Sequence, residues 1–145
     1  MRRSYKFLAL PWQEKWLYLS ATLWLLAAKA GLYLLSFEHL QHLVTRLGEP
    51  NGRRATVQDM QMIVLAIQRI GRFLSPLQIN CLPQALVGYM MLHRRGFAGI
   101  EIKIGVCKDF QQKLAAHAWL EYEGRVLIGD LHNLEEFRPF SSVSL

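Results

Sequence analysis

Cys81, His117 and Asp130 are residues whose types, taken together, can break an amide bond. A cysteine thiolate attacks a carbonyl carbon, an imidazole moves the protons, and a carboxylate orients the imidazole. Such chemistry requires the three side chains to lie within hydrogen-bonding reach of one another. The elements that carry them must therefore bring together residues that are up to 49 positions apart.

A predicted hairpin would join the last two of these residues. Glu123-Gly124 separates two apolar runs and is typical of a two-residue turn. Residues that face each other across such a hairpin have numbers that sum to 247, and 117 and 130 satisfy this rule. Their Cβ atoms would lie about 4.5–5.5 Å apart. We therefore expect Asp130 to orient His117, although a longer loop would change the register.

Cys81 is predicted to begin a helix, with Asn80 as its capping residue and Pro83 in the first turn. The partial positive charge at a helix N-terminus favours a thiolate over a thiol. Gln78 or Asn80 is a candidate side-chain donor to an oxyanion, as is the backbone N–H of Cys81. The alternative is that Cys81 is a small buried apolar residue without a chemical role.

His117 is expected on a strand where alanines at 115, 116 and 118 leave room for a substrate or a nucleophile. The alternative is a structural histidine with one satisfied hydrogen bond. Trp119 shares the face of His117, so it is a candidate to shield the site or to contact substrate. A core aromatic residue is the competing interpretation of Trp119.

The bulk composition favours one folded domain of 145 residues, because apolar residues make up 52% and charged residues 19%. The net charge of +6 is unevenly distributed: +3 over residues 1–50, +5 over 51–100 and −2 over 101–145. The basic excess would attract an acidic peptide, a phosphate or a membrane surface, unless it is only a solvated helix face. We expect no nucleic-acid partner.

The two cysteines, Cys81 and Cys107, are too few for a disulfide framework and favour a reducing compartment, so a cytoplasmic location is expected. Cys107 is predicted to be structural. His39 and His42 share one helix face but lack a third ligand, so we expect no metal site and no cofactor.

Helices are predicted first along the chain, over 12–35 as one long or two short helices, and over 38–47, 56–74 and 81–94. Strands follow at 100–107, 113–122 and 125–130, where the apolar period changes from 3.6 to 2. The tail 131–145 is expected to be irregular, with room for one more short strand. This order predicts an α+β fold. We expect residues 1–50 to form a helical region packed on a core formed by residues 51–145.

The apolar stretch 16–37 has a longest uncharged part of 13 residues, and Lys29 interrupts it. A membrane-spanning helix needs about 18 or more. The sequence favours a core helix of a soluble protein. Contact with a membrane surface, a signal peptide and a span remain open alternatives.

Several motifs resemble one family. They are Asn-Cys-Leu-Pro-Gln-Ala-Leu from position 80, Arg-Arg-Gly-Phe from 94, Ile-Lys-Ile-Gly-Val from 102, and Ala-His-Ala-Trp-Leu-Glu from 116 with Gly-Arg-Val from 124. Together they resemble the B protein of lasso peptide biosynthesis. That protein is a transglutaminase-like, papain-related cysteine peptidase. The resemblance is specific over about 55–140 and is only general in character over 17–48.

The resemblance implies that Cys81 is the nucleophile, His117 the general base and acid, and Asp130 the orienting residue. It implies removal of the leader from a ribosomally made precursor, with cleavage after a threonine near the end of the leader. The chain resembles the split form of this family, in which a separate small protein binds the leader and an ATP-dependent cyclase acts afterwards.

Two other functions remain open on sequence alone. The first is an acyl transferase that passes the Cys81 thioester to an amine. The second is a non-catalytic adaptor whose residues 16–37 dock on a membrane or a partner protein.

Overall fold

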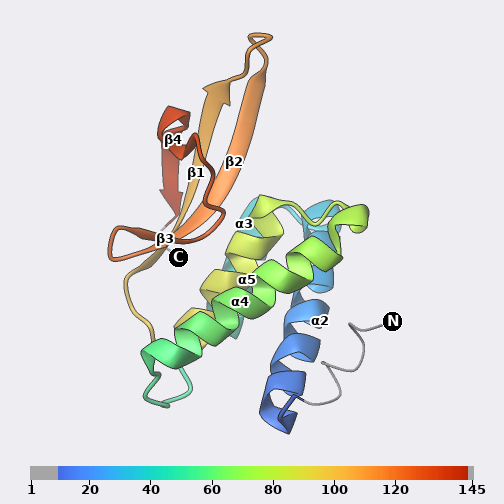
Figure 1. The fold of residues 1–145 in the computed structure, drawn as a ribbon, viewed down its shortest axis with the longest axis vertical. Helices are drawn as coiled ribbons and strands as arrows, with labels where there is room; N and C mark the ends of the chain where they lie inside the picture. Colours follow the sequence, from blue (N-terminus) through green and yellow to red (C-terminus); the bar gives the residue numbers. More distant parts are fainter. Residues whose placement is uncertain (1–9, 144–145) are drawn as a thin grey trace.

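The computed structural model describes residues 10–143, which form four α-helices followed by a four-stranded antiparallel sheet (Figure 1). This order confirms the predicted α+β class. The helices are α2 (Trp12–Leu34), α3 (Phe37–Leu47), α4 (Val57–Phe73) and α5 (Cys81–Arg94). The strands are β1 (Ile100–Lys108), β2 (Leu114–Tyr122), β3 (Arg125–Ile128) and β4 (Arg138–Val143), with short 3₁₀ turns η1 (Ser75–Leu77) and η2 (Leu134–Glu136).

Local capping explains where two of the helices start. Thr56 and Asp59 form a capping box at α4, in which each side chain accepts a hydrogen bond from the backbone N–H of the other residue. The bonds from Thr56 hold the pKa of the Asp59 carboxyl below its usual value. Ser36 caps α3 through a single bond of this kind, by accepting from the His39 backbone N–H. Asn80 occupies the predicted cap position of α5, but its side chain makes no capping hydrogen bond.

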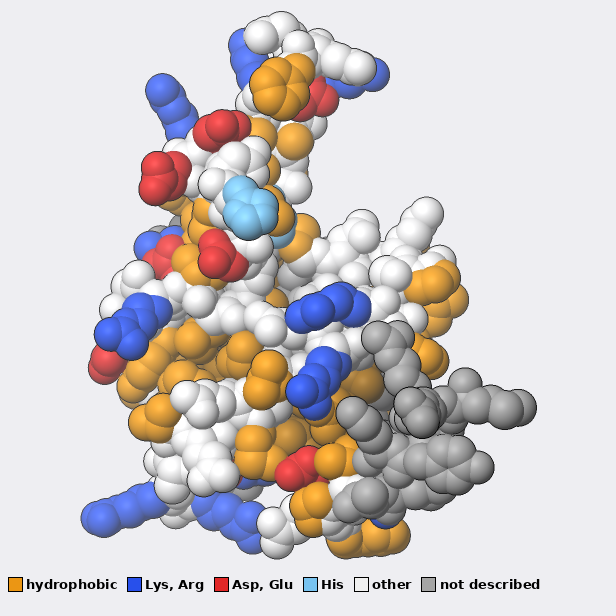
Figure 2. Space-filling view, viewed as in Figure 1, with side chains coloured by type: hydrophobic (Ala, Val, Ile, Leu, Met, Phe, Trp, Pro, Cys, Tyr) orange, Lys and Arg blue, Asp and Glu red, His pale blue; other side chains and the backbone are white. Residues whose placement is uncertain are grey.

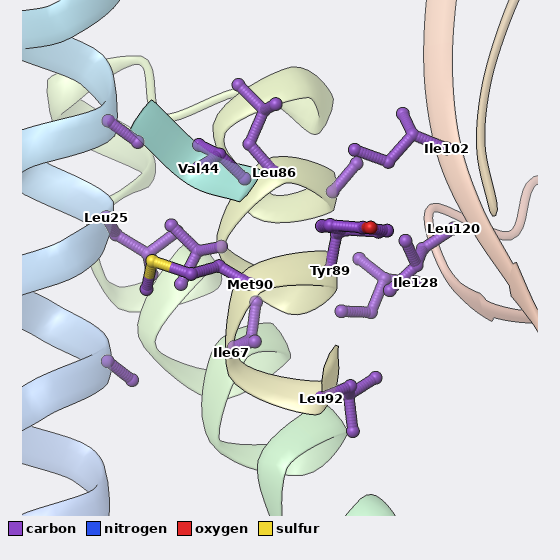
Figure 3. Packing of buried hydrophobic residues seen from close by; sticks show 14 of the residues in the cluster. Leu25, Val44, Ile67, Leu86, Tyr89, Met90, Leu92, Ile102, Leu120 and Ile128 are labelled. Carbon is purple, nitrogen blue, oxygen red and sulfur yellow. The ribbon is translucent and has the colours of Figure 1, made fainter. Parts of the chain in front are cut away.

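Helix α5 lies at the centre of the molecule, and eight of its fourteen residues are buried. Figure 3 shows Leu25 and Val44 on one side of α5, and Leu120 and Ile128 of the sheet on the other. Gly88 lets the layers approach, because a Cβ there would lie 2.6 Å from Ile128 Cδ1. The hydrophobic cluster thus runs without a break from α2 through α5 to the sheet. The division of the chain into residues 1–50 and 51–145 remains a prediction.

The sheet has the strand order β3-β2-β1-β4. The tail therefore supplies the further strand that the sequence left room for, and β4 pairs with β1 at the edge opposite β3. Strands β1 and β2 are much longer than β3, and their shared hairpin projects away from the helices (Figure 1). Because β3 has only four residues, it pairs with β2 from Leu120 to Tyr122 alone.

Helix α2 is a single helix of 23 residues rather than two short ones. It is long and apolar enough to cross a membrane, and it equally fits a soluble protein. Its buried side consists of Ala21, Leu25, Ala28 and Gly31. Small residues on this face let α2 lie close to its neighbours, and a Cβ at Gly31 would lie 2.8 Å from Leu40 Cδ1.

Candidate active site

Cys81 is the first residue of α5 and its side chain is half-buried. Its Sγ accepts a hydrogen bond from the backbone N–H of Ala118 at 3.4 Å. The thiol therefore lies beside β2, next to the residue that follows His117 in the chain. The tertiary structure thus places Cys81 beside the residue that follows His117, although the two site residues are 36 positions apart in the chain.

His117 is held by a backbone carbonyl. Its Nε2 lies 2.6 Å from the oxygen of Gly129. Because a carbonyl oxygen can only accept, Nε2 carries the proton in this contact. In the neutral imidazole Nδ1 is then the atom with a free lone pair. This assignment of the two nitrogens provides a base on one side of the ring and an anchored N–H on the other.

Two aromatic rings restrict the orientation of His117. Trp119 is stacked with it at a centroid distance of 6.2 Å, and Phe137 lies at 5.5 Å in a tilted arrangement. Both aromatic residues are buried. The ring of His117 is therefore fixed by packing as well as by its hydrogen bond, which suits a group that must transfer protons along a defined direction.

The predicted pairing of His117 with Asp130 is wrong, although the turn itself was predicted correctly. Glu123 and Gly124 have φ values of 49° and 76°, as a two-residue type I′ turn requires. The register sum of 247 holds for the first two pairs after the turn. It then shifts by one residue, so that Leu120 faces Ile128 instead of position 127.

This bulge and the end of β3 at Ile128 together move Asp130 away from the facing position. Asp130 is exposed, and among residues 10–143 its side chain has no hydrogen bond or ion pair. The atom that meets the imidazole belongs instead to the preceding residue, Gly129.

Gly129 is suited to this position by its missing side chain. Its φ of +86° lies in a region that L-residues with a Cβ rarely adopt. A Cβ there would also lie 2.8 Å from the Ala118 oxygen and 3.0 Å from Trp119 Cβ. The chain can therefore pass close to β2 and turn its carbonyl to His117 only with glycine at this position. In the sequence, the feature that could have pointed to this carbonyl is the glycine that ends the apolar run before Asp130.

The two predicted oxyanion donors, Gln78 and Asn80, lie in the segment between η1 and α5 and are exposed. Gln78 adopts a left-handed conformation, with φ 53°. Their role as donors remains a prediction.

Lys29 of α2 supports the same segment, a function that sequence reasoning missed. Its ammonium group donates to the backbone oxygens of Leu77 and Gln78, the latter at 3.0 Å. The only signal in the sequence was one lysine in a long apolar run. In the sequence this lysine is only an interruption of that run. In the structure it is a link between α2 and the segment that leads into Cys81.

Trp119 is a core aromatic residue, 4% exposed, which leaves little of its ring for a substrate. It lies over Gly105, where a Cβ would be 3.0 Å from the indole ring. Its Nε1–H donates to Glu121 at 2.7 Å, and Glu121 forms an ion pair with Lys103 at 2.7 Å.

The ionisation of Glu121 follows from these contacts. Burial by itself would raise the pKa of Glu121. The hydrogen bonds from Lys103 and Trp119 outweigh it and lower this pKa. The hydrogen bond that Lys103 donates to Glu121 in turn raises the pKa of Lys103.

Both cysteines are free thiols, and Cys107 lies on β1 opposite Ala115. Within residues 10–143 no group of three or more His, Cys, Asp or Glu side chains is arranged to hold a metal ion. His39 is hydrogen-bonded to Ser36 at 2.6 Å.

The geometry described so far is a thiol at a helix N-terminus, held against the strand residue that follows His117, and an imidazole whose Nε2–H is anchored. Among the described residues no hydrogen bond joins the thiol to the imidazole directly. This geometry can support nucleophilic attack on a carbonyl, formation of a thioester and proton transfer by the imidazole. Comparison with curated proteins and with solved structures finds no significant match. A model of the transglutaminase-like superfamily matches residues 10–142, which is nearly the whole chain. The chain belongs to the transglutaminase-like superfamily.

Proposed function

We propose that this protein is a cysteine endopeptidase that removes the leader from a ribosomally made lasso precursor peptide. The observation that supports it most directly is the position of the Cys81 thiol. Its Sγ lies 3.4 Å from the N–H of Ala118, and the neighbouring His117 is anchored through Nε2. The motifs around these residues, in a chain of the transglutaminase-like superfamily, support the more specific assignment to lasso peptide maturation.

In the proposed mechanism the Cys81 thiolate attacks the carbonyl carbon at the leader–core junction. The C–N bond then breaks, and His117 gives the proton on Nδ1 to the leaving amine of the core peptide. The leader is left as a thioester on Cys81. Water attacks this thioester while His117 accepts a proton, which releases the leader as a carboxylic acid and restores the thiolate–imidazolium pair.

The site has further proposed members. Gln78, Asn80 and the backbone N–H of Cys81 are candidate donors to the oxyanion. Asp130 follows the carbonyl that meets His117. As an exposed carboxylate it would favour the imidazolium only weakly. The step needs neither a metal nor a nucleotide.

The proposed setting is the cytoplasm, with a separate small protein that binds the leader and presents the junction to Cys81. An ATP-dependent cyclase would then close the ring of the released core peptide.

The test is a cleavage assay with precursor and its leader-binding protein, followed by mass spectrometry. Cys81→Ala and His117→Ala should abolish cleavage, whereas Cys107→Ala, the matched control for loss of a thiol, should cleave as the wild type does. If Cys81→Ala cleaves at the wild-type rate, the proposal is wrong. Failure of Cys81 to react with iodoacetamide near neutral pH would favour the non-catalytic adaptor.

An acyl transferase is the second candidate, because the transglutaminase-like superfamily fits both outcomes of a Cys81 thioester. The same mass spectra separate the two. Hydrolysis adds the mass of water to the cleaved leader, while transfer adds the mass of the acceptor amine.

A further inference from the structure

The outer face of α2 carries a continuous apolar stripe. Its members follow one another at alternating spacings of four and three residues, and those with large side chains are 40–77% exposed. We define the α2 stripe as Trp12, Trp16, Leu19, Leu23, Leu26, Ala30 and Tyr33. An exposed apolar surface of this length is unusual on a monomeric soluble protein and is typical of a contact surface.

The α2 stripe cannot be hidden by rotating the helix. The opposite face of α2 is already buried through Ala21, Leu25 and Ala28, so turning one face inward would expose the other. For the same reason α2 cannot leave the folded protein to span a membrane without exposing this part of the hydrophobic cluster. The folded molecule therefore presents the α2 stripe along its surface.

A basic cavity adjoins the N-terminal half of the α2 stripe. It has a volume of about 340 Å³, and Trp16 belongs to both features. Arg53, Arg94 and Arg95 line it, and no carboxylate does. Arg95 is paired with Asp59 at 3.5 Å. The guanidinium groups of Arg53 and Arg94 have no hydrogen bond or ion pair within residues 10–143.

The other flank of the α2 stripe is also basic. Lys15 and Lys29 lie there, each two turns away from Thr22 on the same flank, and Lys29 is bound to the backbone oxygens of Leu77 and Gln78. Glu14 is the only acidic residue in the helix. A ligand that matches this surface would be apolar along its middle and anionic where it meets the cavity.

We propose that α2 lies in the interface of an anionic membrane leaflet. The α2 stripe would be buried at the boundary between headgroups and acyl chains, while Arg53 and Arg94 hold lipid phosphates at the cavity. Trp12, Trp16 and Tyr33 stand at the two ends of the α2 stripe. Amphipathic aromatic residues of this kind are enriched where protein meets headgroups. Lys15 would add positive charge on the other flank.

Charge also argues against the main competing occupant, a second copy of the chain. In an antiparallel pair of α2 helices centred on Thr22, Lys15 of one copy would face Lys29 of the other. The sequence of α2 contains one acidic residue, Glu14, against these two lysines. An anionic lipid surface meets both lysines with charge of the opposite sign.

The test is co-sedimentation of the full chain with lipid vesicles, which does not depend on peptidase activity. One set of vesicles contains phosphatidylglycerol in phosphatidylcholine, and the other contains phosphatidylcholine alone. We expect binding to the first set, weaker binding as salt is raised, and little binding to the second. Arg53→Gln with Arg94→Gln should weaken binding roughly 25-fold, since each basic residue near an anionic surface contributes about fivefold.

Variants of the α2 stripe complete the design. Leu19→Gln with Leu23→Gln should abolish vesicle binding. Because both positions are exposed, thermal unfolding followed by circular dichroism should be unchanged, which excludes misfolding as the cause. The control is Phe110→Gln, a still more exposed apolar residue at the tip of the β1–β2 hairpin, far from α2. This variant should bind vesicles as the wild type does.

Several outcomes overturn the proposal. Equal binding to both vesicle sets would show that the arginines do not hold lipid phosphates. Vesicle binding by the Leu19/Leu23 variant at the wild-type level would show that the α2 stripe is not the contact surface. Absence of vesicle binding, together with dimers in light scattering that the Leu19/Leu23 variant loses, would assign the surface to a second copy. If vesicles do not bind and the Leu19/Leu23 variant loses binding to the leader-recognition protein, the α2 stripe would be assigned to that protein.

Discussion

At the scale of single residues, a backbone carbonyl occupies the place where a carboxylate was predicted. His117 donates from Nε2 to Gly129, and the adjacent Asp130 is exposed. The hydrogen bond fixes the ring and the tautomer without any charge on the acceptor. A neutral acceptor stabilises the imidazolium less than a buried carboxylate would, so orientation rather than charge is the main contribution of this contact.

The Asp130→Asn variant tests this interpretation. We expect kcat/KM to fall by less than about tenfold, because an exposed charge contributes about 1 kcal/mol or less. His117→Ala should cost about a thousandfold or more in the same assay, the usual range for loss of a general base. The measurement is the rate of precursor cleavage under kcat/KM conditions. A loss for Asp130→Asn as large as that for His117→Ala would instead mean that the carboxylate reaches the imidazole during the reaction.

At the scale of elements, α2 is connected to the catalytic segment through one side chain. The Lys29 ammonium group holds the backbone oxygens of Leu77 and Gln78, just before α5 begins at Cys81. Oxygens at the end of a 3₁₀ turn have no partner within the turn, so the lysine satisfies them. It also fixes the direction in which the chain enters α5.

Lys29→Met keeps the length and apolar part of this side chain but removes the hydrogen bonds. We expect kcat to fall by roughly tenfold to a hundredfold with little change in KM, because a small displacement of Cys81 lowers the fraction of productive geometries. The rate of alkylation of Cys81 by iodoacetamide should change in parallel. Lys15→Met on the same helix is the control, with wild-type values expected for both measurements. Equal effects of the two substitutions would contradict a positioning role for Lys29.

The sheet has an ionic contact with a defined pH dependence. The folded protein lowers the pKa of Glu121 and raises that of Lys103. In the unfolded chain the pKa values of Glu121 and Lys103 are near 4.5 and 10.5. The contact therefore contributes fully to stability between these two pH values. This contribution is lost as pH falls below the first and as pH rises above the second.

Glu121→Gln should consequently lower the free energy of unfolding near pH 7 but flatten its decline between pH 6 and pH 3. Urea unfolding at several pH values measures both effects. Glu123→Gln, two residues along and exposed in the turn, is the control and should follow the wild-type curve. If the free energy of unfolding of Glu121→Gln falls as steeply at acid pH as that of the wild type, other carboxylates cause most of the decline.

At the scale of the whole molecule, the site depends on how the sheet packs against α5. Cys81 belongs to the helical layer and His117 to the sheet, so their relative position depends on the hydrophobic contacts between the layers. Leu120 and Ile128 are the buried residues of the sheet nearest to Gly88 of α5. The helices and the sheet therefore share one hydrophobic cluster. Figure 2 shows the same face of the molecule in space-filling form, with Lys and Arg side chains in blue and hydrophobic side chains in orange.

Leu120→Ala should destabilise the protein by about 2–5 kcal/mol, the range for removing a fully buried leucine side chain. Cleavage activity should fall even at temperatures where the variant remains folded, because the cavity loosens the contact between the two layers. Leu114→Ala on the same strand is 74% exposed in the wild type. It should stay within about 0.5 kcal/mol of wild type. Chemical denaturation and precursor cleavage measure both quantities.

The local features follow from the sequence alone. Periodicity, caps and turn residues were sufficient for α3, α4, α5, β1 and the Glu123-Gly124 turn, because each depends on neighbours a few positions away. The placement of Cys81 at a helix start followed from the same local rules. So did the presence of His117 on the strand before that turn.

The partners of the site residues and the exposed face of α2 depend on contacts between distant parts of the chain. A shift of one residue in β3 determined that His117 meets Gly129 rather than Asp130, and a bulge of this kind is set by packing across the sheet, not by the turn. The partners of Lys29 lie 48 and 49 residues away, so no local pattern could identify them. Helix α2 is apolar on nearly all sides, so its sequence does not specify which face is buried. Contact with α4 and α5 covers one face and leaves the α2 stripe exposed.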